Sequence, residues 1–465
     1  MNMRKTTMFF LVLGLLLGSA TVYAWPSKYL TGVTVYDSEK ALNGYTLWAP
    51  LNKPKGADKP WKKPGVVYLM DMHGKVVHKW KTPYPAWYPQ LLPNGNLLVG
   101  QRTDVDINKC PEKPLFGFMG GWFQALLELD WDGNTVREYK NFNMHHDFRK
   151  LKNGNYIFLG WERIPESFQK KIKGGPKGSE MEGGKTMYAD TFTEVDPSGK
   201  VVWHWSALEH MDPVTEVIGS HYGRSEWTHF NSLDVMEDGN ILTDSRRTDA
   251  AYIIDKKTGK VSWRWGATVY WDEENNRIDY HWTEEGQVNA PYLGGPHDCH
   301  EIKSGLPGAG HMICYDNGMY ADRSRAVEVD IKTGKVVWES SGNAFIGRQS
   351  FSSFISGAQR LPNGNTFICD GGNGKFREVT PENEVVWEYV RPIPNDAYLK
   401  WSVFRAFRYG PDYCNQLKDL GDPRRAPILT PHVSRLNVPT LIKGGLELGT
   451  DGAEAGDGPE TMPGY

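Results

Sequence analysis

The sequence predicts an all-β protein, a six-bladed β-propeller of four-stranded antiparallel blades with little helix. Two observations predict this fold: a hairpin with an aromatic second strand recurs along the chain, and a second kind of hairpin is interleaved with it. Helical periodicity is weak throughout, and a lone four-stranded sheet cannot bury both of its faces. Six such sheets are therefore expected to stack radially, so that each twisted blade covers its neighbour.

The first kind of hairpin occurs six times. An alternating apolar strand leads into an acidic turn that contains glycine or asparagine, and the second strand ends in or beside an aromatic residue, as in "TFTEVDPSGKVVWHW". We expect the recurrent aromatic side chains, which include many of the 18 tryptophans, to fill the spaces between blades. The six copies lie at residues 65–80, 125–139, 191–205, 251–265, 325–339 and 375–389.

The second kind of hairpin has an Asn-Gly or Asp-Gly turn, which supplies the positive φ angles that a tight turn needs. Two hairpins per unit make four strands. The first unit lacks a hairpin of this kind, so we expect its blade to be completed by strands from residues 31–50 or from "SVFRAFRYG" at 402–410. The copies lie at 91–100, 150–160, 235–244 and 360–370.

Residues 1–24 are interpreted as a cleaved export signal, because a basic start precedes a short apolar run and small residues close it. That run is too short to span a membrane comfortably, and no second run approaches the required length. We therefore expect a periplasmic or secreted protein without stable membrane insertion. The propeller is expected at 25–410 and a C-terminal extension at 411–465, whose last ~20 residues are rich in glycine and acid and are expected to be disordered.

Charge and cysteine content narrow the partners and the covalent chemistry. A formal net charge of −3 gives no basic surface for a nucleic-acid partner. The five cysteines are an odd number, so in an oxidising compartment at least one stays unpaired within the chain. The first pairing we expect is Cys299 with Cys314.

Histidines fall at comparable points of three consecutive units. His145 and His146 lie just upstream of one Asn-Gly hairpin, and His229 and Asn231 lie upstream of the next. In the following unit, "GGPHDCHEI" places His297 before a divergent hairpin. The first strand of each propeller blade lines the central channel, so we expect these side chains to converge there.

Arg246 lies at the far end of the strand pair that begins at His229, and we expect it to reach the same channel. An always-charged bidentate donor beside imidazoles suits an oxyanion such as sulfate, phosphate or carboxylate. Two chemistries compete. The histidines with Asp147 or Asp298 could bind Zn, Cu or Fe, although the cationic arginine argues against a metal. Alternatively, a neutral imidazole could accept a transferable group and release it again.

Asp298 directly follows His297 in the sequence. Neighbours on a strand point to opposite faces, so we expect Asp298 to face away from the channel. The group that orients the His297 ring is therefore left open.

Three segments together resemble a known family: "EWTHFNSLDV" with the following "DSRR", "PHDCHEI" with the following "ICYDNG", and "SGAQRLPNGNTFICDGG". From about Gly32 to Tyr409 the chain is similar to the bacterial arylsulfotransferases of the arylsulfate sulfotransferase type, which use no nucleotide sulfate donor. The resemblance implies a six-bladed propeller that moves a sulfuryl group from an aryl sulfate to a phenol. It further implies a ping-pong route through a sulfohistidine and no cofactor.

Carried onto this chain, the resemblance makes His297 the nucleophile and His146 a further channel histidine, with His145 as the alternative to His146. Sulfuryl transfer spreads charge over equatorial oxygens, so positioning and fixed donors do most of the catalysis. The groups that match the holders of the sulfuryl oxygens are His229, Asn231 and Arg246, and further candidates for substrate binding are His145, His300 and Trp227.

Other functions stay open at this point. The segments "IIDKKTGKVSWRW" and "EVDIKTGKVVWES" look like the tryptophan-docking repeats of quinone-dependent dehydrogenases, although those usually have eight blades. A propeller can also be a metal-dependent or lyase-like enzyme, a module that binds an anionic ligand, or an interaction scaffold. The expected partners are a small aryl sulfate and a phenol, and a homodimer is left open.

Overall fold

The computed structural model describes residues 31–51, 64–103, 120–176, 187–266, 269–272, 277–280, 293–319, 323–340, 351–392 and 401–424. The expected export signal at 1–24, Cys110 and the end of the C-terminal extension at 425–465 lie outside these residues.

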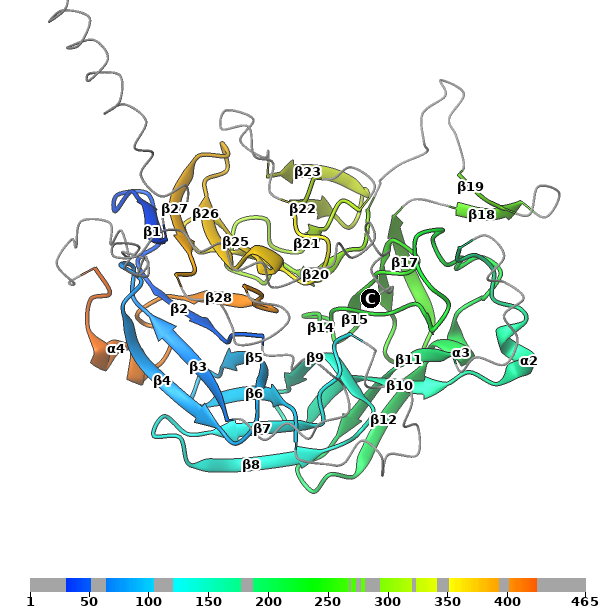
Figure 1. Ribbon diagram of the computed structural model, residues 1–465, viewed down its shortest axis with the longest axis horizontal. Coiled ribbons are helices and arrows are strands. Elements are labelled where there is room, and N and C mark those ends of the chain that lie inside the picture. Colours follow the sequence, from blue (N-terminus) through cyan, green and yellow to red (C-terminus); the bar gives the residue numbers. More distant parts are fainter. Residues whose placement is uncertain are drawn as a thin grey trace, which may run out of the picture.

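Six small antiparallel sheets stand in a ring, which confirms the six-bladed β-propeller (Figure 1). From the innermost strand outward, blade 1 contains β28 (Ala406–Tyr409), β2 (Tyr45–Trp48), β3 (Gly65–Met70) and β4 (Val76–Thr82). Blade 2 contains β5 (Ala86–Leu91), β6 (Leu97–Gln101), β7 (Ala125–Leu129) and β8 (Thr135–Lys140). Blade 3 contains β9 (Met144–Lys150), β10 (Tyr156–Arg163), β11 (Tyr188–Val195) and β12 (Val201–Ser206).

Blade 4 contains β14 (Asp234–Val235), β15 (Ile241–Ser245), β16 (Ala250–Ile254) and β17 (Val261–Gly266). Blade 5 contains β20 (His297–Glu301), β21 (Met312–Asp316), β22 (Arg325–Asp330) and β23 (Lys335–Glu339). Blade 6 contains β24 (Gly357–Arg360), β25 (Thr366–Asp370), β26 (Lys375–Val379) and β27 (Val385–Val390), with β1 (Gly32–Tyr36) as a fifth, outer strand.

The remaining elements are short. Strand β13 (Glu226–Trp227) pairs in parallel with β11, and β18 (Val269–Asp272) with β19 (Arg277–Tyr280) forms a separate hairpin. The helices are α2 (Glu166–Gln169), α3 (Ala207–His210), η3 (Gly371–Asn373) and α4 (Asn415–Leu420). None of the helices in the described ranges is long and apolar enough to cross a membrane.

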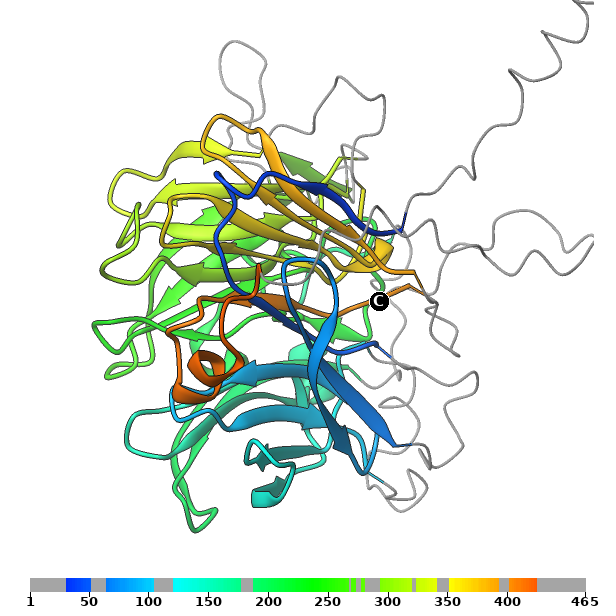
Figure 2. The ribbon, with the colours of Figure 1, turned by 90° about the vertical axis from the view of Figure 1, so that its left-hand side faces the viewer.

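The ring is closed by strands from both ends of the described chain. In blade 1, β28 pairs with β2 so that Tyr409 lies opposite Tyr45. In blade 6, β1 adds to the outer edge of β27, with Gly32 opposite Val390. Figure 2 shows the blue N-terminal strands beside the orange C-terminal strand. The sequence left open which segment completes the first blade, and both segments do so.

Tryptophans near the outer edge of a blade dock onto the next blade, as the recurrent aromatics predicted. The indole N–H of Trp80 in blade 1 donates to the Asp130 carbonyl of blade 2 at 3.1 Å. Trp387 of blade 6 donates to the Met72 carbonyl of blade 1 at 2.8 Å, so this contact also joins the last blade to the first. Each bond contributes about 1 kcal/mol beyond the buried ring area. The same contact joins Trp205 to Gly259, Trp265 to Gly334 and Trp338 to Pro381.

A disulfide joins Cys299 of β20 to Cys314 of β21, as the sequence predicted. Both residues are fully buried. The bond crosslinks the two inner strands of blade 5, and Cys299 lies two residues after His297. Of the other cysteines in the described ranges, Cys369 and Cys414 are free and buried.

Replacing Cys299 and Cys314 together with alanine is expected to lower the free energy of unfolding by about 3 kcal/mol, because a crosslink that closes a loop of 15 residues restricts the unfolded chain. Denaturant unfolding measures the change. A reductant should destabilise the wild type by a similar amount and leave the double variant unaffected. Equal unfolding midpoints for the reduced and oxidised wild type would contradict the prediction.

Candidate functional site

Bulges in the inner strands direct residues toward the centre of the ring. The pairing of β9 with β10 shifts register between Phe158 and Leu159, and His146 has a left-handed φ of 47°. The pairing of β20 with β21 shifts after His297, and Asp298 has a φ of 59°. An extra residue in one strand interrupts the alternation of side chains. Consecutive residues of an inner strand can therefore both point inward.

The ring of His297 is held in one tautomer. Its Nδ1 lies 3.1 Å from the Gly295 carbonyl and 2.7 Å from Oδ1 of Asn317. Asn317 is oriented in turn, because its Nδ2 donates to the carbonyls of Ser352 and Ile355 at 2.6 and 3.0 Å. Both partners of Nδ1 are acceptors, so Nδ1 carries the proton. Nε2 then holds the lone pair, and it accepts the Ile355 backbone N–H at 3.1 Å.

The surroundings of His297 keep it neutral. Burial, followed by the nearby positive charge of Arg246, lowers the pKa of His297 well below its usual value. The side chain is only 2% exposed, so water does little to stabilise an imidazolium. A neutral ring with a fixed lone pair on Nε2 is a nucleophile that needs no separate base.

His146 is oriented through His145. Oδ1 of Asp190 lies 3.0 Å from Nε2 of His145, which stacks on Trp161 with ring centroids 4.3 Å apart. In a neutral His145 ring the other nitrogen, Nδ1, is then an acceptor, and it lies 2.8 Å from Nδ1 of His146. Burial and the neighbouring imidazole of His229 lower the pKa of His146 well below its usual value. The sequence alternatives thus take different places: His146 lies in the site and His145 supports it.

His229 is paired with a carboxylate that the sequence did not reveal. Its Nδ1 lies 2.5 Å from Oε2 of Glu226, and Arg247 lies 3.4 Å from the other oxygen of that carboxylate. Although burial opposes ionisation, His229 and Arg247 lower the pKa of Glu226 to about 2. Burial lowers the pKa of His229 even against the attraction of Glu226. The rings of His229 and His146 lie with centroids 4.7 Å apart.

Arg246 and Asn231 complete the group. The Arg246 backbone N–H donates to the His229 carbonyl at 3.0 Å, and its Nη1 donates to the Ser353 carbonyl at 3.0 Å. A Cβ added to Gly295 would lie 3.2 Å from that Nη1, so the glycine leaves room for the guanidinium. Nδ2 of Asn231 donates to the Pro296 carbonyl at 2.7 Å. Oδ1 of Asn231 is buried and has no hydrogen-bond partner among the described residues.

Two candidates lie outside this group. Trp227 packs in the apolar core of blades 3 and 4, where its indole N–H donates to the Glu216 carbonyl at 2.8 Å. His300 is partly exposed, and its described contacts are with Asp298, whose carbonyl lies 2.8 Å from Nδ1. The structure therefore brings His146, His229 and His297 together and leaves these two side chains apart.

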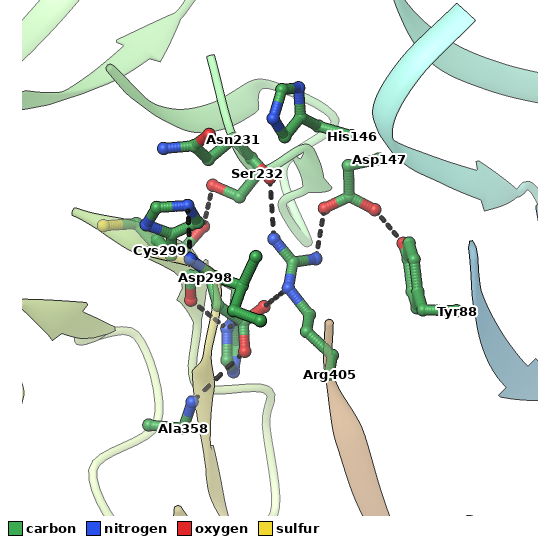
Figure 3. A network of polar contacts seen from close by, with 12 residues as sticks. Tyr88, His146, Asp147, Asn231, Ser232, Asp298, Cys299, Ala358 and Arg405 are labelled. Atoms are coloured by element: carbon green, nitrogen blue, oxygen red, sulfur yellow. Dashed lines mark hydrogen bonds and ion pairs between the residues drawn. The ribbon is translucent and has the colours of Figure 1, made fainter. Parts of the chain in front are cut away.

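The expectation for Asp298 was wrong. Its carboxylate points to the centre of the ring, where Oδ1 lies 3.2 Å from Nε of Arg405 (Figure 3). The physical reason is the bulge at Asp298, which removes the alternation on which the expectation depended. The residues that sequence reasoning missed are Asp190, Glu226, Asn317, Ile355 and Arg405. Of these, Glu226, Asn317 and Arg405 lay in the quoted segments "EWTHFNSLDV", "ICYDNG" and "SVFRAFRYG", but none was singled out there.

Metal ligation was the alternative chemistry for these histidines. Within the part of the chain that the structure describes, no group of three or more His, Cys, Asp or Glu side chains is arranged to hold a metal ion. The two carboxylates considered, Asp147 and Asp298, are instead ion-paired with Arg405.

Comparison with solved structures finds remote similarities. They include a protein of unknown function from Bacteroides caccae, at 14% identity and a TM-score of 0.44 over 78% of this chain and 98% of that one. A streptogramin B lyase has 10% identity and a TM-score of 0.38 over 79% and 98% of the two chains. A catalytically inactive virginiamycin B lyase from Staphylococcus aureus, solved with quinupristin, has 10% identity and a TM-score of 0.35 over 76% and 94%. These values are too low to bear on function.

No curated protein matches the chain significantly. The sequence model of the arylsulfotransferase (ASST) family matches residues 27–392, which include every strand of the six blades except β28 and all of the site residues except Arg405. The chain therefore belongs to the arylsulfotransferase (ASST) family.

Proposed function

We propose that the protein transfers a sulfuryl group from an aryl sulfate to a phenolic acceptor through a sulfohistidine on His297. The observation that carries the proposal is the fixed Nδ1–H tautomer of His297, with a lone pair on Nε2 and the cationic Arg246 nearby. A buried neutral nucleophile beside an always-charged donor suits an anionic substrate.

The first half-reaction leaves the sulfuryl group on the enzyme. Nε2 of His297 attacks sulfur, the S–N bond forms, and the bond from sulfur to the aryl oxygen breaks. The electron pair of that bond leaves with the phenolate, which takes any proton it needs from solvent. In the resting protein the Ile355 N–H donates to Nε2 of His297. During transfer this N–H and the guanidinium of Arg246 stabilise the negative charge on the sulfuryl oxygens.

The second half-reaction moves the group to the acceptor. The acceptor oxygen attacks sulfur, the S–N bond breaks, and its electron pair returns to Nε2. His229 accepts the phenolic proton, because Glu226 stabilises the imidazolium that results. The unpartnered Oδ1 of Asn231 is a suitable acceptor for the phenolic O–H before transfer. His229 then releases this proton to solvent, and the enzyme has its starting protonation states.

The proposal is tested by mixing purified protein with an aryl sulfate and no acceptor. Intact-mass analysis should show one added SO3 group, and peptide mapping should place it on His297. Adding a phenol should remove the adduct and yield the sulfated phenol without any nucleotide donor. Absence of both the adduct and the product would refute the proposal.

The pH dependence of kcat/KM follows from the lowered pKa of His297. The nucleophile must be neutral, and its pKa lies well below the ordinary value of 6.5 because of burial and the charge of Arg246. Protonation therefore begins only at a pH well below 6.5, and kcat/KM should stay constant as the pH falls through 6.5. Initial rates across that range provide the measurement, and an acid limb centred at or above 6.5 would contradict the expectation.

A further inference from the structure

Arg405 lies at the centre of the ring, just before the inner strand of blade 1. Its Nη1 donates to Oδ2 of Asp147 at 2.6 Å, and its Nη2 donates to the Asn231 carbonyl at 2.7 Å. Its Nε lies 3.2 Å from Oδ1 of Asp298. Figure 3 shows the guanidinium between the two carboxylates. We call Arg405, Asp147, Asp298 and the Asn231 carbonyl the axial hub.

Each partner of Arg405 is next to a residue of the site in the sequence. Asp147 follows His146 on β9, and Asp298 follows His297 on β20. Asn231 comes two residues after His229 and is itself a site residue. One planar guanidinium therefore holds three segments of the chain, β9, β20 and the loop before β14, each of which carries one of the three site histidines.

The axial hub also reaches the two other blades. Tyr88 of blade 2 donates its hydroxyl to Oδ1 of Asp147, and the Ala358 backbone N–H of blade 6 donates to Oδ2 of Asp298 at 3.2 Å. The Leu233 N–H of blade 4 adds a bond of 2.8 Å to Asp147. All six blades thus meet at the two carboxylates and the one arginine that pairs with both.

The two carboxylates of the axial hub are buried, and they therefore need the positive charge of Arg405 beside them. Asp147, Asp298 and Arg405 are at most 3% exposed, and an unpaired buried charge is strongly destabilising. Although burial opposes ionisation, Arg149 and Arg405 hold the pKa of Asp147 below its usual value. For Asp298, burial outweighs Arg405 and raises the pKa. Arg405 is the largest of the influences that oppose this rise.

We infer that Arg405 is a positioning residue, which sets the mutual geometry of His146, His229 and His297 by holding the backbone next to each of them. The inference rests on the proposed function for its kinetic readout. A compact ammonium in place of the guanidinium cannot bond to three partners in one plane. The three imidazoles would then lose their positions relative to one another, although the six blades would still form a closed propeller.

The experiment compares Arg405→Lys with Arg408→Lys. Arg408 is a matched control, because it is equally buried on β28 and pairs with Glu378 at 3.3 Å, but its described partners include none of the three histidine-bearing segments. Both variants should lose stability in denaturant unfolding. With protein shown to be folded, Arg405→Lys should lower kcat about 100-fold with little change in KM, because a displacement of about 1 Å costs that much. Arg408→Lys should leave kcat unchanged.

A second measurement does not depend on catalysis. In protein labelled with 13C-histidine, Arg405→Lys should shift the NMR signals of His146, His229 and His297, assigned from single His→Gln variants, and Arg408→Lys should not. If the wild type transfers no sulfuryl group, the proposed function is wrong, but the histidine NMR signals still test whether Arg405 positions the three histidines. Unchanged signals in folded Arg405→Lys, or losses of kcat that are equal in the two variants, would overturn the inference.

Discussion

Replacing His297 with alanine is expected to reduce sulfuryl transfer to the background rate. The change removes the only atom proposed to bond to sulfur, Nε2, and no neighbouring imidazole is oriented by the same acceptor pair, Gly295 and Asn317. Loss of a covalent nucleophile costs roughly a million-fold where it has been measured in hydrolases. Steady-state transfer from an aryl sulfate to a phenol measures the rate, and intact-mass analysis measures the adduct.

The matched control for this variant is His300→Ala on the same strand. His300 is partly exposed and contacts Asp298 rather than the site, so its removal should leave transfer nearly unchanged. Denaturant unfolding checks that His297→Ala is folded, and its midpoint should lie near that of the wild type. Turnover that survives His297→Ala in folded protein would eliminate His297 as the nucleophile.

Replacing Arg246 with alanine is expected to lower kcat by 100- to 1,000-fold, about 3–4 kcal/mol of transition-state stabilisation. The side chain is only 5% exposed, and its guanidinium is held near His297 by the Ser353 carbonyl. A donor fixed before the reaction stabilises developing charge without reorganisation. Arg246→Lys keeps the charge and should recover part of the rate, because an ammonium lacks the two-pronged geometry.

Two kinetic constants separate the possible roles of Arg246. A residue that acts only in the transition state lowers kcat and kcat/KM equally, whereas one that only binds substrate raises KM. We expect the first pattern for Arg246→Ala. A rise in KM with unchanged kcat would assign Arg246 to ground-state binding of the sulfate and would contradict its proposed role.

The fold was predictable from the sequence because its signals are local. The turn of "PNGN" at Gly95 and the aromatic end of each outer hairpin are set within a few residues, and they recur along the chain. The final pairing at the ring closure was not predictable, because β1 and β28 join partners from the opposite end of the chain. Only the assembled ring brings these partners, which lie far apart in the sequence, next to each other.

The site was predictable only in part. Three histidines at equivalent positions of successive blades are expected to converge if the blades form a ring. In the structure the rings of His146 and His229 lie with centroids 4.7 Å apart, and His297 is close enough to influence the pKa of His146. The direction of Asp298 depended on a bulge that leaves no sequence signal, so it was assigned to the wrong side. Glu226 lies only three residues before His229, but acidic residues are common throughout the sequence and nothing marks this one. Arg405 belongs to the site through contacts with residues far away in the sequence.

The position of Arg405 late in the sequence affects when the site can form during synthesis. It follows Asp147 by 258 positions, so a ribosome makes both aspartates of the axial hub well before it makes their shared cation. A nascent chain that already contains all three histidines still lacks the arginine that aligns them. Catalytic competence should therefore arise late and abruptly during biogenesis, and a fragment truncated before β28 should be inert although it retains His297.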